Sequence, residues 1–269
     1  MKLYDAHNHL QDERLRPWIA DILDAMPRDG IQCAVVNGSS EEDWEDVARL
    51  ARAHSWIKPS FGLHPWYVKE RSPQWQDTLL RYLDEFPAAA VGEIGLDRWI
   101  QNPDLPAQEE VFRRQLDIAA SQDRPATIHC LKAWGLLEET LRSTTLPRRG
   151  FLLHSYGGPA EMVPQFAALG AYFSLSPYFT HERKSRQAQT FATVPIDRLL
   201  AETDAPDMWP PDDLNDHPLH DAKGKPLNHP RNLRLSYRKL AEIRGMPVEE
   251  LALQIEENFR RLFVQSPAK

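Results

Sequence analysis

The stretch Asp5-Ala6-His7-Asn8-His9 ends the first apolar run of the chain. Side chains two residues apart on a β-strand point to the same face. His7 and His9 therefore direct two imidazoles toward one point, as a divalent metal site requires. Two ordinary histidines near a chain end are the alternative, and the rest of the sequence decides between these interpretations.

Short apolar runs alternate with longer amphipathic stretches along the whole chain. Eight runs have the length of strands: Leu3–His7, Ile31–Asn37, Pro59–Leu63, Ala88–Ile94, Ala126–Cys130, Phe151–Ser155, Ala171–Leu175 and Leu199–Thr203. Helical spacing of apolar residues covers Ser40–His54 (with a serine cap), Gln108–Gln122, Pro159–Leu169, His181–Thr193, Arg231–Arg244 and Pro247–Phe263.

This alternation predicts an α/β protein, a single (β/α)8 TIM barrel formed by one domain over residues 1–269. An open doubly wound sheet is the alternative. The barrel is favoured because the strand number fits and no glycine-rich dinucleotide fingerprint follows the first strand.

Composition limits the class of protein. The 269 residues carry a net charge of −7, which argues against a broad basic surface for nucleic acid. Cys33 and Cys130 lie in apolar runs and cannot form a disulfide framework, so we expect small core residues and a reducing compartment. No signal peptide or run of membrane-spanning length is present, which predicts a cytoplasmic protein without a membrane partner, either a monomer or a weak oligomer.

Titratable residues follow the predicted strands at their carboxyl ends, where barrel enzymes carry their chemistry. They are His7, His9, His64, Glu93, His129, His154 and Asp204. A glutamate in an apolar run is costly to bury unpaired, so a metal or another cation is expected near Glu93. Glu202 lies two residues before Asp204 and is a weaker rival ligand.

Four histidines and two carboxylates are too many ligands for one four-coordinate ion with an open position. They predict two divalent metal cations, with Zn, Mn, Fe or Co favoured by the histidines and Mg left possible by the carboxylates. Glu93 and Asp204 cancel only part of the charge of two divalent ions, so the pocket is expected to keep a net positive charge that suits an anionic substrate.

These motifs resemble the TatD family of metal-dependent hydrolases. The resemblance rests on Asp5-Ala6-His7-Asn8-His9, Gly62-Leu63-His64-Pro65, Gly92-Glu93-Ile94-Gly95-Leu96-Asp97, Ile128-His129-Cys130 and Glu202-Thr203-Asp204-Ala205-Pro206. It implies a barrel that holds two divalent cations and hydrolyses phosphodiester bonds, typically in DNA. It also implies roles for individual residues: His7 and His9 on the first ion, Glu93 bridging, His129 and His154 on the second, Asp204 as a ligand of the first ion and general base, and His64 beside the substrate.

The sequence also departs from the family pattern. Leu131 stands where a basic residue is usual, with Lys132 beside it, and His154-Ser155-Tyr156-Gly157-Gly158 replaces a commoner motif. The long segment Trp209–Pro230 is expected to be a loop that acts as a lid or a substrate wall. Asn228-His229-Pro230 also differs from the usual Asn-Glu-Pro.

The resulting hypothesis is a phosphodiesterase or deoxyribonuclease acting on DNA ends or small phosphodiesters, with Asp204 and Glu93 catalytic. Single-stranded DNA ends suit an acidic chain better than long duplexes. Candidate phosphate anchors are Arg98 and Lys132. Tyr156, Trp99 and Trp209 are candidates for stacking on a base.

Two alternatives stay open. One is hydrolysis of an amide, lactone or aminoacyl ester bond at the same centre, because a fold does not fix a reaction. The other is a barrel that binds metal without catalysis.

Overall fold

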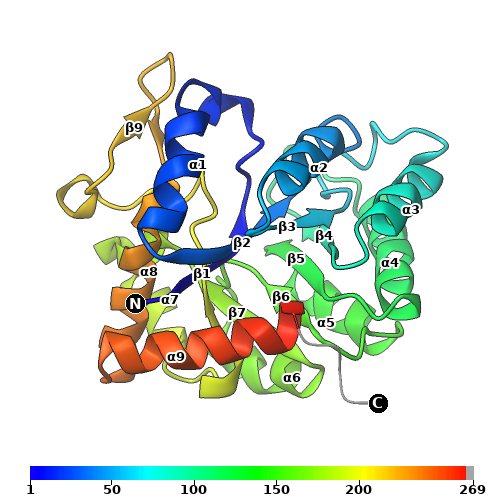
Figure 1. The fold of residues 1–269 in the computed structure, drawn as a ribbon. Helices are drawn as coiled ribbons and strands as arrows, with labels where there is room; N and C mark the ends of the chain where they lie inside the picture. The colour runs from blue at the N-terminus through cyan, green and yellow to red at the C-terminus, as the bar shows by residue number, and fades with distance from the viewer. Residues whose placement is uncertain (265–269) are drawn as a thin grey trace.

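The structure, a computed structural model, describes residues 1–264. Its main sheet contains eight parallel strands in the order of the sequence, from β1 to β8, surrounded by helices (Figure 1). The strands are β1 (Leu3–Asn8), β2 (Ile31–Asn37), β3 (Ile57–Phe61), β4 (Ala90–Asp97), β5 (Ala126–Leu131), β6 (Phe151–Leu153), β7 (Ala171–Leu175) and β8 (Leu199–Ala201). The predicted (β/α)8 barrel is therefore confirmed.

Helices follow most of the strands and cover the outside of the barrel. The α-helices are α1 (Ile19–Arg28), α2 (Trp44–Ala53), α3 (Trp75–Glu85), α4 (Leu105–Ser121), α5 (Trp134–Arg142), α6 (Val163–Ala168), α7 (Ser185–Thr190), α8 (Leu233–Arg244) and α9 (Val248–Phe259). Short 3-10 helices are η1 (Glu13–Trp18), η2 (Ala160–Met162), η3 (Pro177–Thr180), η4 (Glu182–Lys184), η5 (Ile196–Arg198), η6 (Asp212–Leu214) and η7 (Pro230–Asn232), and a π-helical turn covers Arg260–Val264.

Side-chain and backbone hydrogen bonds together close the barrel between β8 and β1. The backbone N–H of Thr203 donates to Asp5 Oδ1 at 2.9 Å, and its hydroxyl donates to Asp5 Oδ2 at 2.6 Å. Just beyond, the N–H of Asp204 donates to the carbonyl of His7 at 2.9 Å. The completely buried carboxylate of Asp5 thus satisfies groups that a regular ladder would otherwise pair.

The segment after β8 contains regular secondary structure, whereas the sequence predicts a loop. It contains η6 and a small antiparallel hairpin of β9 (Leu219–His220) and β10 (Pro226–Leu227), which projects from one corner of the molecule (Figure 1). Asn228 anchors its return, donating through Nδ2 to the carbonyl oxygen of Thr203 at 2.7 Å. The segment therefore leaves the end of β8 and returns to it at Asn228.

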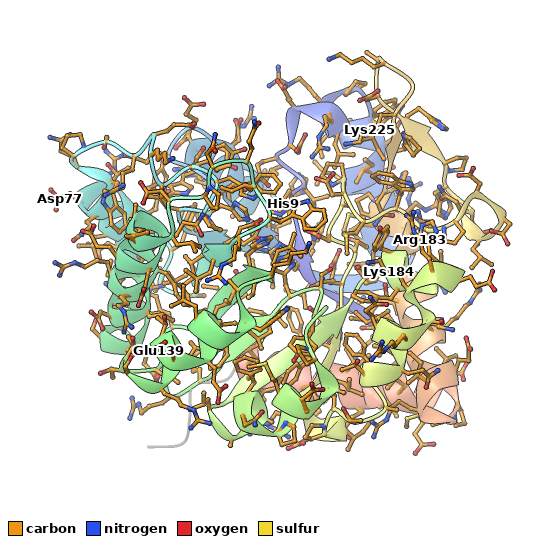
Figure 2. All side chains as sticks on the ribbon, turned by 180° about the vertical axis from the view of Figure 1, so that it is seen from behind. His9, Asp77, Glu139, Arg183, Lys184 and Lys225 are labelled. Carbon is orange, nitrogen blue, oxygen red and sulfur yellow. The ribbon has the colours of Figure 1, made fainter. Side chains whose placement is uncertain are left out.

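Buried apolar side chains fill the space between the sheet and the helices, and charged side chains such as Asp77 and Glu139 lie at the outer edge (Figure 2). Helix α9 packs against β1 and β8 and covers the seam of the barrel from outside. Cys33 and Cys130 are free thiols that pack against the core, as predicted. None of the helices within residues 1–264 combines the length and the apolar composition needed to cross a bilayer.

Element boundaries differ from the sequence prediction at several places. Helix α2 begins at Trp44 rather than Ser40, because the side chain of Asp43 accepts the N–H groups of Ser39 and Ser40 in a turn before the helix. Pro247 is the N-cap of α9 rather than its first helical residue. Helices α1, α3 and α5 were absent from the prediction.

Candidate metal centre

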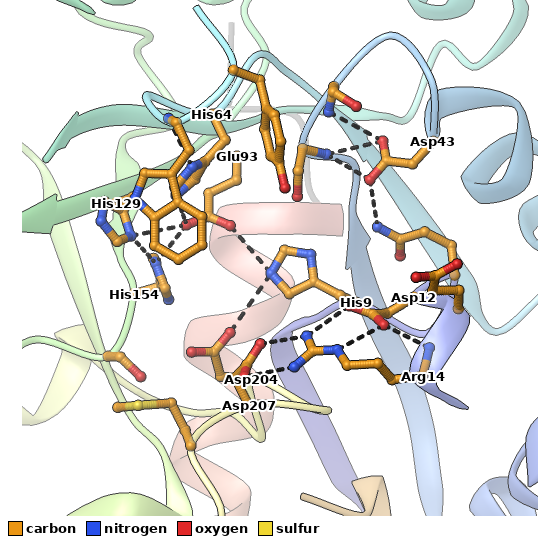
Figure 3. A pocket seen from close by; sticks show the side chains of 18 of the residues that line it. His9, Asp12, Arg14, Asp43, His64, Glu93, His129, His154, Asp204 and Asp207 are labelled. Atoms are coloured by element: carbon orange, nitrogen blue, oxygen red, sulfur yellow. Dashed lines mark hydrogen bonds and ion pairs between the residues drawn. The ribbon is translucent and has the colours of Figure 1, made fainter. Parts of the chain in front are cut away.

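Glu93 occupies the middle of the site, at the carboxyl end of the barrel (Figure 3). It follows Gly92 on β4, and the peptide bond between them is cis. A Cβ atom on Gly92 would lie 1.8 Å from Thr127 Oγ1, so only glycine fits this close approach of β4 to β5. The side chain of Glu93 is almost completely buried, so its charge is stable there only if neighbouring groups compensate it.

The two carboxylate oxygens of Glu93 face two different groups of side chains. Oε2 lies 3.4 Å from His7 Nε2 and 3.2 Å from His9 Nε2, and Asp204 completes this first group. Oε1 lies 2.9 Å from His154 Nε2 and 3.2 Å from His129 Nδ1. All six residues predicted to bind metal are thus brought together, from β1, β4, β5 and the segments that follow β1, β6 and β8.

The spacing of the donor atoms fits metal coordination. His7 Nε2 and His9 Nε2 are 3.2 Å apart, and Asp204 Oδ1 lies 3.6 and 3.7 Å from them. Ligand atoms about 2.0–2.1 Å from a tetrahedral ion lie about 3.3 Å from one another. His154 Nε2 and His129 Nδ1 are 3.4 Å apart. Both groups therefore have the donor types and the spacing of divalent-ion ligands.

The hydrogen bonds behind two histidines leave the inward nitrogen free to bind metal. His9 Nδ1 lies 2.8 Å from the carbonyl oxygen of Asn37, which only a protonated nitrogen can satisfy, so Nε2 is the nitrogen left to bind a metal. His129 Nε2 lies 2.9 Å from Asp97 Oδ2, which in the same way leaves Nδ1 as the ligand atom.

His64 has the opposite arrangement. Its Nε2 is 3.3 Å from Glu93 Oε1, close enough for His64, Glu93 and His129 to form a possible ligand group. However, the backbone N–H of Trp66 donates to His64 Nδ1 at 3.2 Å, which leaves the hydrogen of the neutral ring on Nε2. His64 therefore directs a donor toward Glu93 Oε1, and its role beside the substrate stays a prediction.

Burial and neighbouring charges set the ionisation of the site. Burial acts to raise the pKa of Glu93, but the imidazoles of His64, His154 and His7 hold that pKa well below its usual value. Burial lowers the pKa of His7 to about 3, which keeps its ring neutral. Burial is the main cause that raises the pKa of Asp204 to about 8, which favours its protonated form at neutral pH, and a cation beside it would favour the carboxylate.

Buried polar side chains that the sequence prediction did not assign hold the ligands in place. Gln115 and Gln108 of α4 bond both backbone groups of Leu63 and of Asp97, which fixes the chain beside His64 and the carboxylate behind His129. Glu202, the rival ligand, accepts hydrogen bonds from the backbone and hydroxyl of Ser155 at 2.7 and 2.6 Å. Its Oε1 lies 3.7 Å from His154 Nδ1, too far for a hydrogen bond, and Glu202 also forms a candidate ligand group with His7 and His154, so its assignment as a rival ligand stays a prediction.

A pocket of about 1050 Å³ opens above the candidate metal ligands. Trp209 and Lys225 line it, so the segment after β8 forms a wall of the pocket, as predicted; a role as a lid stays a prediction. Figure 2 labels Lys225 above His9 when the molecule is seen from behind.

The lining of the pocket is more acidic than expected, since the sequence predicts a pocket with a net positive charge. The side formed by the segments after β1 and β2 carries five carboxylates, Asp12, Glu13, Glu42, Asp43 and Asp46. Arg14 lies between Asp12 and Asp207 and is paired with both at 2.7 Å. Arg16 and Lys225 also line the pocket, and neither forms a salt bridge within residues 1–264.

Three of the predicted substrate residues lie elsewhere. Tyr156 is completely buried, donates its hydroxyl to the carbonyl of Pro159 and packs against Phe173, so its assignment to substrate binding is wrong. Arg98 and Lys132 do not line the pocket, and the ammonium of Lys132 lies 3.5 Å above the ring of Trp99, which is also outside it. Their role as phosphate anchors stays a prediction.

Comparison with known proteins agrees with this geometry. The family model described as "TatD related DNase" matches residues 4–264. The chain belongs to the TatD family. The metal-dependent hydrolase YjjV of Escherichia coli (strain K12) is 30% identical over 236 residues, 87% of either chain. The protein named "3'-5' ssDNA/RNA exonuclease TatD" of Pantoea vagans is 29% identical over 246 residues, covering 87% of this chain and 88% of that protein.

A solved structure has the same fold. The crystal structure of the TatD homologue YjjV from Escherichia coli superimposes with a TM-score of 0.88 at 27% identity, over 98% of both chains. Together with the clustered histidines and carboxylates, these similarities establish a metal-dependent hydrolase of the TatD family that acts on ester bonds.

Proposed function

We propose that this protein is a phosphodiesterase with a dinuclear centre that acts on short nucleic-acid ends or small phosphodiesters. The observation that carries the proposal is the division of Glu93. One carboxylate oxygen faces His7 and His9, and the other faces His129 and His154. A carboxylate with separate donor groups on its two oxygens is the arrangement of a bridging ligand between two cations.

The residues of the site have distinct tasks. When bound, divalent cations activate water and neutralise the negative charge of a phosphodiester. Asp204 accepts the proton of the attacking water, because its carboxylate lines the pocket at the edge of the first donor group, with Oδ1 3.6 Å from His7 Nε2. His64 donates Nε2–H to a phosphate oxygen, and Arg16 and Lys225 attract the substrate from the mouth of the pocket.

The acidic side of the pocket favours a short substrate. A long polyanion crossing this mouth would meet the carboxylates of Glu42 and Asp46, whereas binding of long nucleic acids depends on many cationic contacts. A single reacting phosphate at the centre of the pocket avoids this repulsion. The exonuclease name of the Pantoea relative supports the same class of substrate, a single-stranded end.

A second candidate follows from the same acidic wall. An ester, lactone or amide with little negative charge would enter this pocket without repulsion from Asp43 and Asp46. Hydrolysis of such a neutral substrate faster than of a dinucleotide, at equal metal loading, would favour this candidate.

The test combines metal content with activity. We expect about two equivalents of divalent metal in the loaded wild-type protein and hydrolysis of a single-stranded dinucleotide. Glu93→Gln removes the charge that both donor groups share, so metal content and activity both fall, while circular dichroism shows the folded barrel. Glu250→Gln, an exposed change on α9, serves as the control. Full metal content and turnover in Glu93→Gln would contradict the proposal.

A further inference from the structure

Trp66 combines an exposed ring with a fixed polar atom. Its side chain is 51% exposed and lines the pocket. The indole Nε1–H donates to Asp97 Oδ2 at 2.7 Å, and Asp97 is completely buried. An exposed tryptophan on a surface is usually free to rotate, whereas this ring is held in one orientation before any ligand arrives.

The bond to Asp97 also fixes the ring relative to the metal donors. The same oxygen, Asp97 Oδ2, lies 2.9 Å from His129 Nε2, so one carboxylate positions the indole and a metal-binding imidazole together. The rings of Trp66 and His64 meet edge to face with centroids 4.9 Å apart. The indole therefore lies immediately beside the groups that handle the reacting phosphate.

Two other tryptophans suggested by the sequence do not offer the same surface. Trp99 is 62% exposed but lies outside the pocket, with the ammonium of Lys132 above its ring. Trp209 lines the pocket but is partly buried, and Lys225 lies 5.7 Å from its ring centroid. Of these three rings, Trp66 alone is half exposed, fixed and directed to the pocket.

We propose that Trp66 is a stacking platform for the nucleobase next to the scissile bond, so that the enzyme selects nucleotides over phosphodiesters without a base. This inference rests on the proposed phosphodiesterase function and names its substrate class. Stacking on an aromatic ring tolerates any base, because every base has a π-face. A ring fixed in advance loses little conformational freedom on binding, which strengthens the contact.

The kinetic test compares two substrates on each variant. One is a thymidine dinucleotide, and the other is the same phosphodiester with tetrahydrofuran abasic sites in place of both nucleosides. Trp66→Leu is expected to lower kcat/KM for the thymidine dinucleotide by about 5–100-fold, the effect of losing one stacked base. The ratio of kcat/KM for the thymidine dinucleotide to that for the abasic substrate falls by the same factor, because any effect of the lost Trp66–Asp97 hydrogen bond on His129 acts on both substrates alike. Trp66→Phe keeps a ring and retains most of the preference for the base.

The matched control is Trp99→Leu, which removes a tryptophan of similar exposure outside the pocket. It leaves the preference for the base-bearing substrate unchanged. Equal losses on both substrates in Trp66→Leu, or an unchanged preference, would overturn the inference.

A binding experiment separates this inference from the proposed function. Calorimetric titration compares thymidine 5′-monophosphate with deoxyribose 5-phosphate on the metal-loaded wild type, Trp66→Leu and Trp66→Phe. We expect the wild type and Trp66→Phe to bind the nucleotide more tightly, and Trp66→Leu to bind both ligands equally. If the wild type hydrolyses no phosphodiester, the proposed function fails, yet this comparison still decides the role of Trp66. Equal binding of both ligands by the wild type rejects the stacking platform.

Discussion

The backbone N–H of Asp204 donates a hydrogen bond of 2.9 Å to the carbonyl oxygen of His7. This bond joins the segment after β8 to β1. The side chains of both bonded residues, Asp204 and His7, belong to the first donor group, together with His9. Asp204 has a φ of 56°, an uncommon value for a residue with a side chain, and the bond to His7 helps to hold it there. The contact that closes the barrel therefore also brings the residues of the first donor group together.

Asp5 gives the first prediction, because its carboxylate closes the same seam. Asp5→Ala leaves the buried N–H and hydroxyl of Thr203 without their acceptor. Each unsatisfied group costs about 1–3 kcal/mol, so the free energy of unfolding measured in urea falls by at least that amount. Asp117→Ala, an exposed change on α4, is the control. A loss below about 0.5 kcal/mol in Asp5→Ala would show that the seam does not depend on this carboxylate.

Metal removal gives the second prediction. The donor groups around Glu93 form only in the folded chain, so metal binds the native state and stabilises it. At a free metal concentration one hundred times the Kd, the free energy of unfolding rises by about 2.7 kcal/mol relative to chelator-treated protein. Thermal denaturation with and without added zinc or manganese measures this difference. Equal melting temperatures in the two conditions would argue against metal binding by the native chain.

Asp97 gives the third prediction. Asp97→Asn weakens the acceptor that keeps the hydrogen of His129 on Nε2 and its lone pair on Nδ1. Loss of such a partner typically lowers metal affinity by about 10–100-fold, which competition with a chelator of known affinity measures. Asp104→Asn, which changes the N-cap of α4, is a matched control away from the site. Unchanged metal affinity in Asp97→Asn would indicate that packing alone orients His129.

Lys58 gives a prediction about pH, far from the metal donors in sequence. It lies on β3 with 9% of its surface exposed, and burial lowers its pKa to about 8, helped by the charges of Arg149 and Arg124. In the unfolded chain the lysine pKa is about 10.4. Between pH 8 and 10 the unfolded state therefore binds more protons, and the contribution of Lys58 to stability rises with pH.

Lys58→Met removes this buried charge while keeping the length of the side chain. At pH 7 the substitution is expected to raise the free energy of unfolding by about 2–3 kcal/mol, and the gain shrinks as the pH approaches 10. Urea denaturation at pH 7 and pH 10 tests both parts. The control Lys223→Met, in the exposed hairpin after β8, leaves the free energy of unfolding unchanged at both pH values. Destabilisation by Lys58→Met at pH 7 would mean that an interaction of the ammonium outweighs its burial.

Sequence patterns predicted the barrel and its ligands because strand ends leave local signals. A histidine such as His129, or an acid such as Glu93, inside or just after a short apolar run can be recognised without knowing the rest of the structure. Helix α3 was missed although Trp75, Leu79 and Leu83 follow helical spacing and are buried. Helix α5 is short and has Gly135 in its first turn, which weakens its pattern.

The residues that support the ligands could not be derived in the same way. Gln115 lies 52 residues from Leu63, and its contact depends on how α4 packs against the sheet. Tyr156 was misassigned because a polar aromatic residue after a ligand suits a pocket wall as well as a core. Asp97, four residues after Glu93 in the same apolar run, carried a recognisable signal, since a carboxylate there needs a partner.

The seam between Asp5 and Thr203 joins residues that are 198 positions apart. During synthesis, His7 and His9 leave the ribosome long before the strand that completes their coordination sphere. A nascent chain that stops before β8 therefore exposes a sheet edge and offers metal only part of its ligands. The complete ligand set of the proposed centre therefore exists only after translation of the last strand.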